Sequence, residues 1–111
     1  MIGADAIRGH IALMVLAILE YQDSYAYEIS RIITQISDGK YTMKQATLYT
    51  AVKRLESMGF LESYQGISES GKTRTYYQLT QAGHMHLDQK RAEWVLTREL
   101  VNRFVEGDVF P

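Results

Sequence analysis

The hydrophobic period changes twice along this chain, and these changes constrain the fold more than any other feature of the sequence. Up to Gly59, apolar residues recur every three or four positions, which is the spacing of amphipathic helices. Two short aromatic-rich segments, Phe60–Tyr64 and Thr75–Leu79, then read as strands separated by glycine and serine. From Thr80 to Val105 the helical spacing returns. The expected order is three helices, a β-hairpin and a long last helix, so the fold class is mainly α (α+β).

Capping residues indicate where these helices begin and end. The first should be a single helix from about Asp5 to Tyr21. Thr42 followed by Gln45 has the spacing of a capping box, which predicts the start of the third helix. Serine and threonine are favoured N-caps, and glycine is favoured just after a helix because it adopts a positive φ without strain. The residues that we expect in these roles are Ser24 and Thr80 at helix starts, and Asp38-Gly39 and Gly59 at helix ends.

The composition describes one ordinary domain and excludes several chemistries. The chain has 111 residues, of which 46% are hydrophobic and 23% are charged, as expected for one globular unit. It has no cysteine, which excludes disulfides, thiolate metal ligands and cysteine nucleophiles and fits a reducing compartment. The longest apolar run, Ile11–Leu19, is about half as long as a membrane span requires. The start of the chain does not resemble a signal peptide. We therefore expect a cytoplasmic protein that does not enter the membrane.

One motif match and a pair of histidines suggest enzyme or metal chemistry, but their context argues against both. Residues Gly66–Thr73 fit the P-loop pattern of a glycine, four residues and Gly-Lys-Thr. A P-loop must lead into a helix that receives the phosphates, whereas Thr75–Leu79 reads as a strand. His84 and His86 are two positions apart, so on a helix their side chains diverge, and no third ligand has suitable spacing. We expect no enzymatic activity, no metal site and no cofactor.

The third helix carries the strongest functional signal. The net charge of the chain is −1, yet four basic residues and no acidic residue lie between Gly39 and Leu55. The outward face of this helix combines amide, hydroxyl, lysine and tyrosine groups, which suit base edges and phosphates. Such a face alone is equally typical of a solvated helix. The following hairpin, with Lys72 and Arg74 at its expected tip, completes the order of a winged helix-turn-helix, in which the wing contacts DNA beside the recognition helix.

Three motifs in this order resemble the PadR-like transcriptional regulators. The likeness covers about Ile7 to Phe104, and its single last helix is similar to the short subfamily. Two positions depart from the family pattern, since Ala26 and Thr75 stand where glycine and a base are common. The motifs are Tyr25-Ala26-Tyr27-Glu28-Ile29 for the second helix, Ala46-Thr47-Leu48-Tyr49-Thr50 with Lys53-Arg54-Leu55-Glu56 and Gly59-Phe60-Leu61 for the recognition helix, and Gly71 to Gly83 for the wing and last cap.

The resemblance implies a bacterial homodimer that represses promoters, often of detoxification or efflux genes, and releases operator DNA when a small aromatic compound binds. It implies a winged helix over residues 1–79 and a dimerisation helix over residues 80–111, as one compact unit. Tyr49 and Lys53 match recognition-helix contact positions in the family, and Lys72 and Arg74 match wing positions. With the polar residues around them, the candidate DNA-binding set is Lys44, Gln45, Thr47, Tyr49, Thr50, Lys53, Lys72 and Arg74.

The last helix suggests both a dimer and an effector site. A helix from Thr80 to Val105 is about 39 Å long, and this small domain can bury only one face of it. Its apolar stripe consists of Leu87, Trp94, Val101 and Phe104. The resemblance implies that Trp94 stacks a planar aromatic molecule at the dimer interface, although plain interface packing explains a tryptophan here equally well. Because an indole face attracts positive charge, cationic compounds are expected, with Asp88 or Glu93 adding to that preference.

The alternative function is a winged-helix module that binds another protein instead of DNA. Such a module should present an apolar face on the third helix, whereas this face carries Gln45, Thr50 and Lys53.

Overall fold

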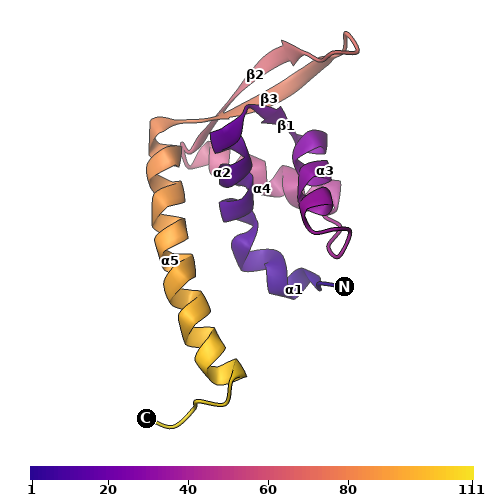
Figure 1. Cartoon of the computed structure of the whole chain (residues 1–111). Coiled ribbons are helices and arrows are strands. Elements are labelled where there is room, and N and C mark those ends of the chain that lie inside the picture. The colour runs from indigo at the N-terminus through magenta and orange to yellow at the C-terminus, as the bar shows by residue number, and fades with distance from the viewer.

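The computed structural model describes residues 1–111 and has the architecture of a winged helix with one long appended helix (Figure 1). The fold class predicted from the sequence is confirmed. The helix α5 extends well beyond the body of the molecule on the side away from α3, and the hairpin projects at the opposite end (Figure 1). The elements are α1 (Ala4–Ile7), the 3₁₀ helix η1 (Arg8–His10), α2 (Ile11–Tyr21), β1 (Ser24–Tyr25), α3 (Ala26–Ile36), α4 (Gln45–Ser57), β2 (Leu61–Ile67), β3 (Thr73–Leu79) and α5 (Gln81–Val105).

A single hydrophobic core joins α2, α3, α4, the hairpin and the first part of α5. Helices α2, α3 and α4 each contribute one apolar stripe to it, as the helical spacing predicted, and α5 contributes Leu87. The tyrosine ring of Tyr77 from β3 and the side chain of Leu61 from β2 close the core on the sheet side. Its members are Ile11, Val15, Leu16, Leu19, Ile29, Ile33, Tyr41, Met43, Leu48, Val52, Leu55, Leu61, Tyr77 and Leu87.

The first helix is not continuous, contrary to the expectation of one helix from about Asp5 to Tyr21. The chain forms α1, tightens into η1 and restarts as α2, and His10 has the non-helical angles φ −118° and ψ 0°. Gly9 lies inside η1, and glycine weakens a regular helix because it gains the most freedom when it leaves one. The break turns the amino-terminal segment across the start of α2 (Figure 1).

Two predicted helix caps are wrong. Ser24 belongs to β1 instead of capping α3, and its hydroxyl donates a hydrogen bond of 2.6 Å to the Glu28 carboxylate. Helix α4 begins at Gln45 with Lys44 as its N-cap, so Thr42 and Gln45 form no capping box. Instead, the Gln45 amide makes a tertiary contact by donating a hydrogen bond to Ser30 of α3.

Both predicted helix ends before the hairpin are confirmed. Helix α4 ends in a Schellman motif, in which Gly59 has φ 84° and the Phe60 amide donates to the Leu55 carbonyl at 3.0 Å. Helix α3 ends in the same way, except that Asp38, with φ 55°, takes the first left-handed position and Gly39 follows it with φ 76°.

The sheet is antiparallel with strand order β1-β3-β2, and its hairpin is longer than predicted. The strands extend to Ile67 and from Thr73, so only the segment between them turns, closed by the Ser68 amide donating to the Lys72 carbonyl at 2.9 Å. Gly66 pairs with Arg74 inside the ladder, where a Cβ atom would lie 2.6 Å from the Tyr76 ring. Close packing against the Tyr76 ring therefore explains this glycine.

Helix α5 is held to the body only along its first part. Thr80 caps it as predicted, since its hydroxyl oxygen accepts a hydrogen bond of 3.0 Å from the Gly83 amide. Arg91 forms two hydrogen bonds, of 2.9 and 3.2 Å, with the Glu20 carboxylate of α2. Beyond Arg91 every side chain of the helix is exposed. None of the helices has both the length and the apolarity that a membrane crossing requires.

Candidate nucleic-acid interface and neighbouring hollows

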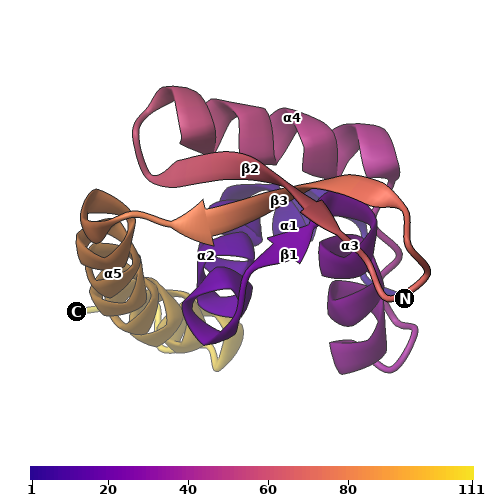
Figure 2. The ribbon, with the colours of Figure 1, turned by 90° about the horizontal axis from the view of Figure 1, so that it is seen from above.

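Helix α4 and the wing form the two walls of a small groove. Helix α4 runs along one edge of the molecule beside β2 (Figure 2). The groove encloses about 250 Å³ at the first turn of α3. It brings together three of the predicted DNA-binding residues, Tyr49, Lys53 and Arg74, from two elements that are far apart in the sequence. The sequence prediction did not identify the other side chains that line it, which are Tyr25, Ala26, Tyr27, Thr73, Thr75 and Tyr77.

Lys53 is one of the two cations of this groove and is paired with Glu56. Its ammonium lies 5.4 Å from the centre of the Tyr49 ring and 3.5 Å from the Glu56 carboxylate one turn along the helix. The phenol groups of Tyr77 and then Tyr49 raise the pKa of Lys53 above its ordinary 10.5. Lys53 is therefore fully charged at neutral pH, and a phosphate that binds it must compete only with an exposed, weak ion pair.

Arg74 does not lie at the hairpin tip, contrary to expectation. It sits inside β3, and its guanidinium carbon lies 4.6 Å from the centre of the Tyr25 ring, a cation–π contact. Its Nε atom is buried without a hydrogen-bond partner. The side chain therefore braces the outer part of the wing, in the second residue pair from the turn, against the start of α3, whereas Lys72 is exposed beside the turn. The two basic residues of the wing thus lie in different places, Lys72 at the turn and Arg74 within β3.

The remaining predicted contacts lie on different sides of α4. The Gln45 amide is already engaged with Ser30, which leaves its carbonyl oxygen available. Thr50 is exposed. Lys44 and Thr47 line a separate hollow against the amino-terminal segment, away from the wing. The structure thus places Tyr49, Lys53 and Arg74 in one site and Lys44 and Thr47 outside it.

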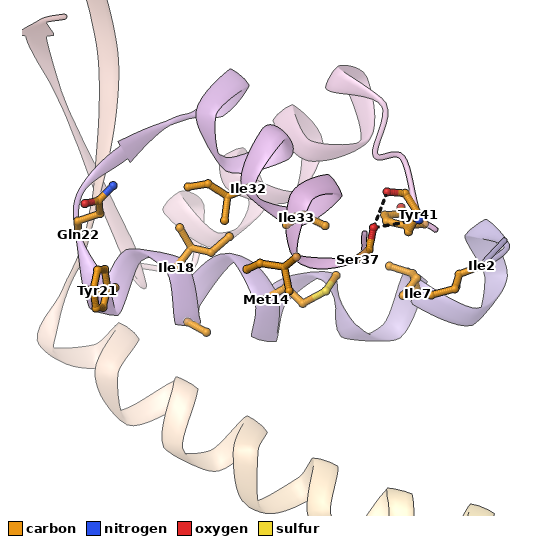
Figure 3. Close-up of a pocket in the computed structure, with 12 residues that line it drawn as sticks. Ile2, Ile7, Met14, Ile18, Tyr21, Gln22, Ile32, Ile33, Ser37 and Tyr41 are labelled. Atoms are coloured by element: carbon orange, nitrogen blue, oxygen red, sulfur yellow. Dashed lines mark hydrogen bonds between the residues drawn. The ribbon is translucent and has the colours of Figure 1, made fainter. Parts of the chain in front are cut away.

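Two larger hollows lie away from the wing and differ in chemistry. The α2–α3 hollow encloses about 640 Å³ and is apolar, with ten hydrophobic residues among the twelve that line it (Figure 3). Ile18, Ile32 and Met14 point into it from facing helices, and Ser37 is occupied by hydrogen bonds to Tyr41 (Figure 3). The second hollow, here called the α4–α5 groove, encloses about 670 Å³ between η1, the start of α2, α4 and α5. Sequence reasoning found neither, because each forms between elements that are distant in the chain.

The predicted apolar stripe of α5 divides into two parts. Leu87 is fully buried in the core of its own chain, so the expectation that it lies on an exposed interface is wrong. Trp94 is 37% exposed, and the ring of His10 packs edge-on against it with centroids 4.9 Å apart. Val101 and Phe104 are exposed, as are their neighbours Leu96 and Leu100.

The P-loop pattern lies on the hairpin. Lys72 and Thr73 lead directly into β3, so no helix N-terminus faces the loop. The context that this motif needs to bind phosphate is therefore replaced by a β-turn.

Comparison with known proteins identifies the family. The model of the transcriptional regulator PadR-like family matches residues 15–89, from α2 into α5. A transcriptional regulator from Clostridium thermocellum is 43% identical and superposes with a TM-score of 0.85, covering 95% of this chain and 99% of that one. A PadR family transcription regulator from Clostridium difficile is 35% identical, with a TM-score of 0.74 over 87% of this chain and 99% of that one. Bacillus subtilis PadR, solved in complex with operator DNA, is 20% identical and shares the fold, with a TM-score of 0.63 over 71% of this chain and 45% of that one. The matched family and these structures are transcriptional regulators and not enzymes, and this chain belongs to the transcriptional regulator PadR-like family.

Proposed function

We propose that this protein is a dimeric, ligand-responsive repressor that binds operator DNA through α4 and the wing. The observation that carries the proposal is the groove in which Tyr49, Lys53 and Arg74 meet. Lysine and tyrosine suit phosphates, and the exposed Thr50 and the free carbonyl of Gln45 suit base edges. As a regulator of promoters it would act in the cytoplasm. The proposal that its targets are detoxification or efflux genes rests on the resemblance of the motifs alone.

The test is binding to a labelled duplex taken from immediately upstream of its own gene, followed by fluorescence anisotropy at several salt concentrations. Lys53→Ala should weaken binding and reduce the slope of log K against log salt by about 0.9, because one phosphate contact is lost. Arg103→Ala, on α5 and paired with Asp108, is the matched control and should bind as the unmodified protein does. Unchanged affinity and slope in Lys53→Ala would show that the assigned face is wrong.

The dimer is supported by the apolar surface of α5. Leu96, Leu100 and Phe104 are exposed by 68%, 59% and 60%, and nothing in the chain covers them. An exposed stripe of this kind is typical of a protein interface. We expect it to pair with the first helices of a second copy, which would present two α4 helices to DNA about 34 Å apart. Light scattering at micromolar concentration tests this, and a monomeric mass would contradict it.

The proposed effector is a planar aromatic molecule that stacks on Trp94. The indole is accessible, and the edge-on ring of His10 shows that it already makes one aromatic contact. Trp94 is the only tryptophan of the chain, so its fluorescence reports binding directly. Planar compounds should quench it, and Trp94→Ala should lose their binding while keeping its circular dichroism. Full ligand affinity in that variant would make Trp94 a packing residue.

A further inference from the structure

Three tyrosines form a continuous cluster on the face of the sheet that is turned away from the core. Tyr76 of β3 is paired with Tyr25 of β1 on one side and with Tyr64 of β2 on the other, so their side chains share one face. The Tyr76 ring meets Tyr25 edge-on, with centroids 5.5 Å apart, and lies nearly parallel to the Tyr64 ring at 5.7 Å. The next residue along β3, Tyr77, belongs to the core on the opposite face. The three residues Tyr25, Tyr64 and Tyr76 are called the tyrosine cluster below.

Polar contacts extend the tyrosine cluster at both ends. At one end the Tyr64 hydroxyl donates a hydrogen bond of 2.6 Å to the carboxylate of Asp23, which directly precedes β1. This hydrogen bond raises the pKa of Tyr64 above its ordinary 10, so the phenol keeps the proton that it donates. At the other end the guanidinium of Arg74 stacks on the Tyr25 ring, with 4.6 Å between its carbon and the ring centre. The cluster therefore connects the chain before α3 to both strands of the wing.

The outer part of the wing has little other support. The core reaches only the end of the hairpin that carries Leu61 and Tyr77. Strand β1 pairs with Tyr76 and Tyr77 alone, so the residues of β3 nearer the turn have β2 as their single neighbour. A two-stranded hairpin without further packing is marginally stable in water. Tyr76 supplies that packing, because its ring covers Gly66 so closely that a Cβ atom there would lie 2.6 Å from it.

The stacked Arg74 side chain is fixed in place but has donors to spare. Its Nε atom is buried without a hydrogen-bond partner, which shows how closely the stem is packed. Its two terminal nitrogens are not buried and donate to no group of the chain, so they are open to a ligand. No carboxylate lines the groove between α4 and the wing, whereas Lys53 of α4 lines it together with Arg74. A guanidinium placed in this way suits a phosphate oxygen.

We propose that Tyr25 and Tyr76 are positioning residues for DNA binding, which fix Arg74 so that its terminal nitrogens meet a backbone phosphate beside α4. This inference rests on the proposed function. Tyr25 holds the guanidinium directly, and Tyr76 holds both Tyr25 and the outer strands. A side chain that is ordered before binding loses less conformational entropy when the contact forms. The tyrosine cluster therefore raises the affinity for DNA through Arg74, with no contact of its own to the phosphate.

The first test measures fluorescence anisotropy of the labelled duplex from immediately upstream of the gene, at several salt concentrations. Tyr25→Leu should weaken binding at least about fivefold and reduce the slope of log K against log salt by about 0.9, because the Arg74 contact is lost. Tyr25→Phe keeps the ring and should bind within about twofold of the unmodified protein. Placed in an Arg74→Ala background, Tyr25→Leu should cause no further loss. A loss that adds in full to that of Arg74→Ala would show that Tyr25 does not act through Arg74.

The second test moves the Tyr76 ring without replacing any tyrosine. Gly66→Ala places a methyl group where the ring lies, so it should displace Tyr76 and weaken the duplex by a similar factor. Hydrogen exchange of the free protein reports the wing itself: amides of residues 64–74 should exchange at least about threefold faster in Gly66→Ala and in Tyr76→Leu. Tyr76→Phe should exchange as the unmodified protein does. Unchanged exchange in both Gly66→Ala and Tyr76→Leu would overturn the role of Tyr76.

The same measurements separate this inference from the proposed function. If the unmodified protein binds no operator duplex, the proposed function fails and the inference fails with it. If the duplex binds and Tyr25→Leu keeps both its affinity and its salt slope, the proposed function stands and the positioning role of the tyrosine cluster is wrong.

Discussion

Thr80→Val should loosen the joint between the wing and α5. The Thr80 hydroxyl accepts a hydrogen bond from the Gly83 amide at 3.0 Å and donates one to the Gly59 carbonyl at 2.7 Å. Loss of the N-cap costs about 1 kcal/mol, and the second hydrogen bond, to an exposed carbonyl, adds about 0.5 to 1 kcal/mol. The expected loss of unfolding free energy is therefore about 2 kcal/mol.

Urea unfolding followed by circular dichroism measures this loss at one fixed protein concentration, because a dimer unfolds in a concentration-dependent way. With a slope of about 1.5 kcal/mol per molar urea, the midpoint should fall by about 1.3 M. Thr80→Ser keeps both hydrogen bonds and should stay within about 0.3 M of the unmodified protein. Thr97→Val, in the exposed part of α5, is the matched control for the loss of a hydroxyl. A Thr80→Val midpoint within that margin, or a Thr80→Ser protein as weak as Thr80→Val, would refute the capping argument.

Three further perturbations follow from the packing of α5. Leu87→Ala should lower the unfolding free energy by about 2 to 5 kcal/mol, measured by urea unfolding, because it opens a cavity at a fully buried site. Gly83→Ala should lower the thermal midpoint measured by circular dichroism, since a Cβ atom there would collide with the Phe60 carbonyl oxygen and meet the Leu79 side chain at 2.7 Å. The Arg91 guanidinium holds the pKa of Glu20 below its ordinary 4.5, so this pair stabilises the fold above that pH and the contribution disappears as acid protonates the carboxylate. Between neutral pH and a pH below the pKa of Glu20, the unfolding free energy of the unmodified protein should therefore fall by more than that of Arg91→Gln. If the unfolding free energies of the two proteins fall in parallel, the pair is not a source of stability.

The order of helices, hairpin and last helix could be predicted because each element carries its own period. Leu48, Val52 and Leu55 are a helical stripe in the sequence and a core stripe in α4. The end of α4 could also be predicted from local sequence, because the positive φ at this position favours glycine, which is Gly59. The break at η1 was missed because the apolar period continues through it, and Gly9 alone does not reveal that the backbone departs from a helix.

Tertiary contacts account for the incorrect predictions. Ser24 pairs with Tyr77 in the sheet, and nothing near it in the sequence announces that partner. Leu87 belongs to the heptad stripe by spacing, yet it lies in the core of its own chain because the first part of α5 packs against α2. The sequence predicts a solvent-facing Arg74 on the wing, whereas its guanidinium stacks on the ring of Tyr25, which lies almost fifty positions earlier in the chain. The residue types of the candidate site could be predicted from the sequence, whereas the positions of its charged side chains in space could not.

The position of α5 would determine how the proposed effector site and the proposed DNA site communicate. Helix α4 lies between the wing and α5, since its Tyr49 and Lys53 face the wing groove while Thr50, Ala51 and Arg54 line the α4–α5 groove. A ligand changes an equilibrium only through contacts that differ between two states. The α4–α5 groove lies between the winged helix and α5, which is joined to the winged helix only along its first part, by Thr80, Leu87 and the Arg91–Glu20 pair. A small rotation of α5 about this joint would change the width of the groove and, in a dimer held together by α5, the separation of the two α4 helices. The same motion would therefore be felt by an operator whose half-sites lie about 34 Å apart.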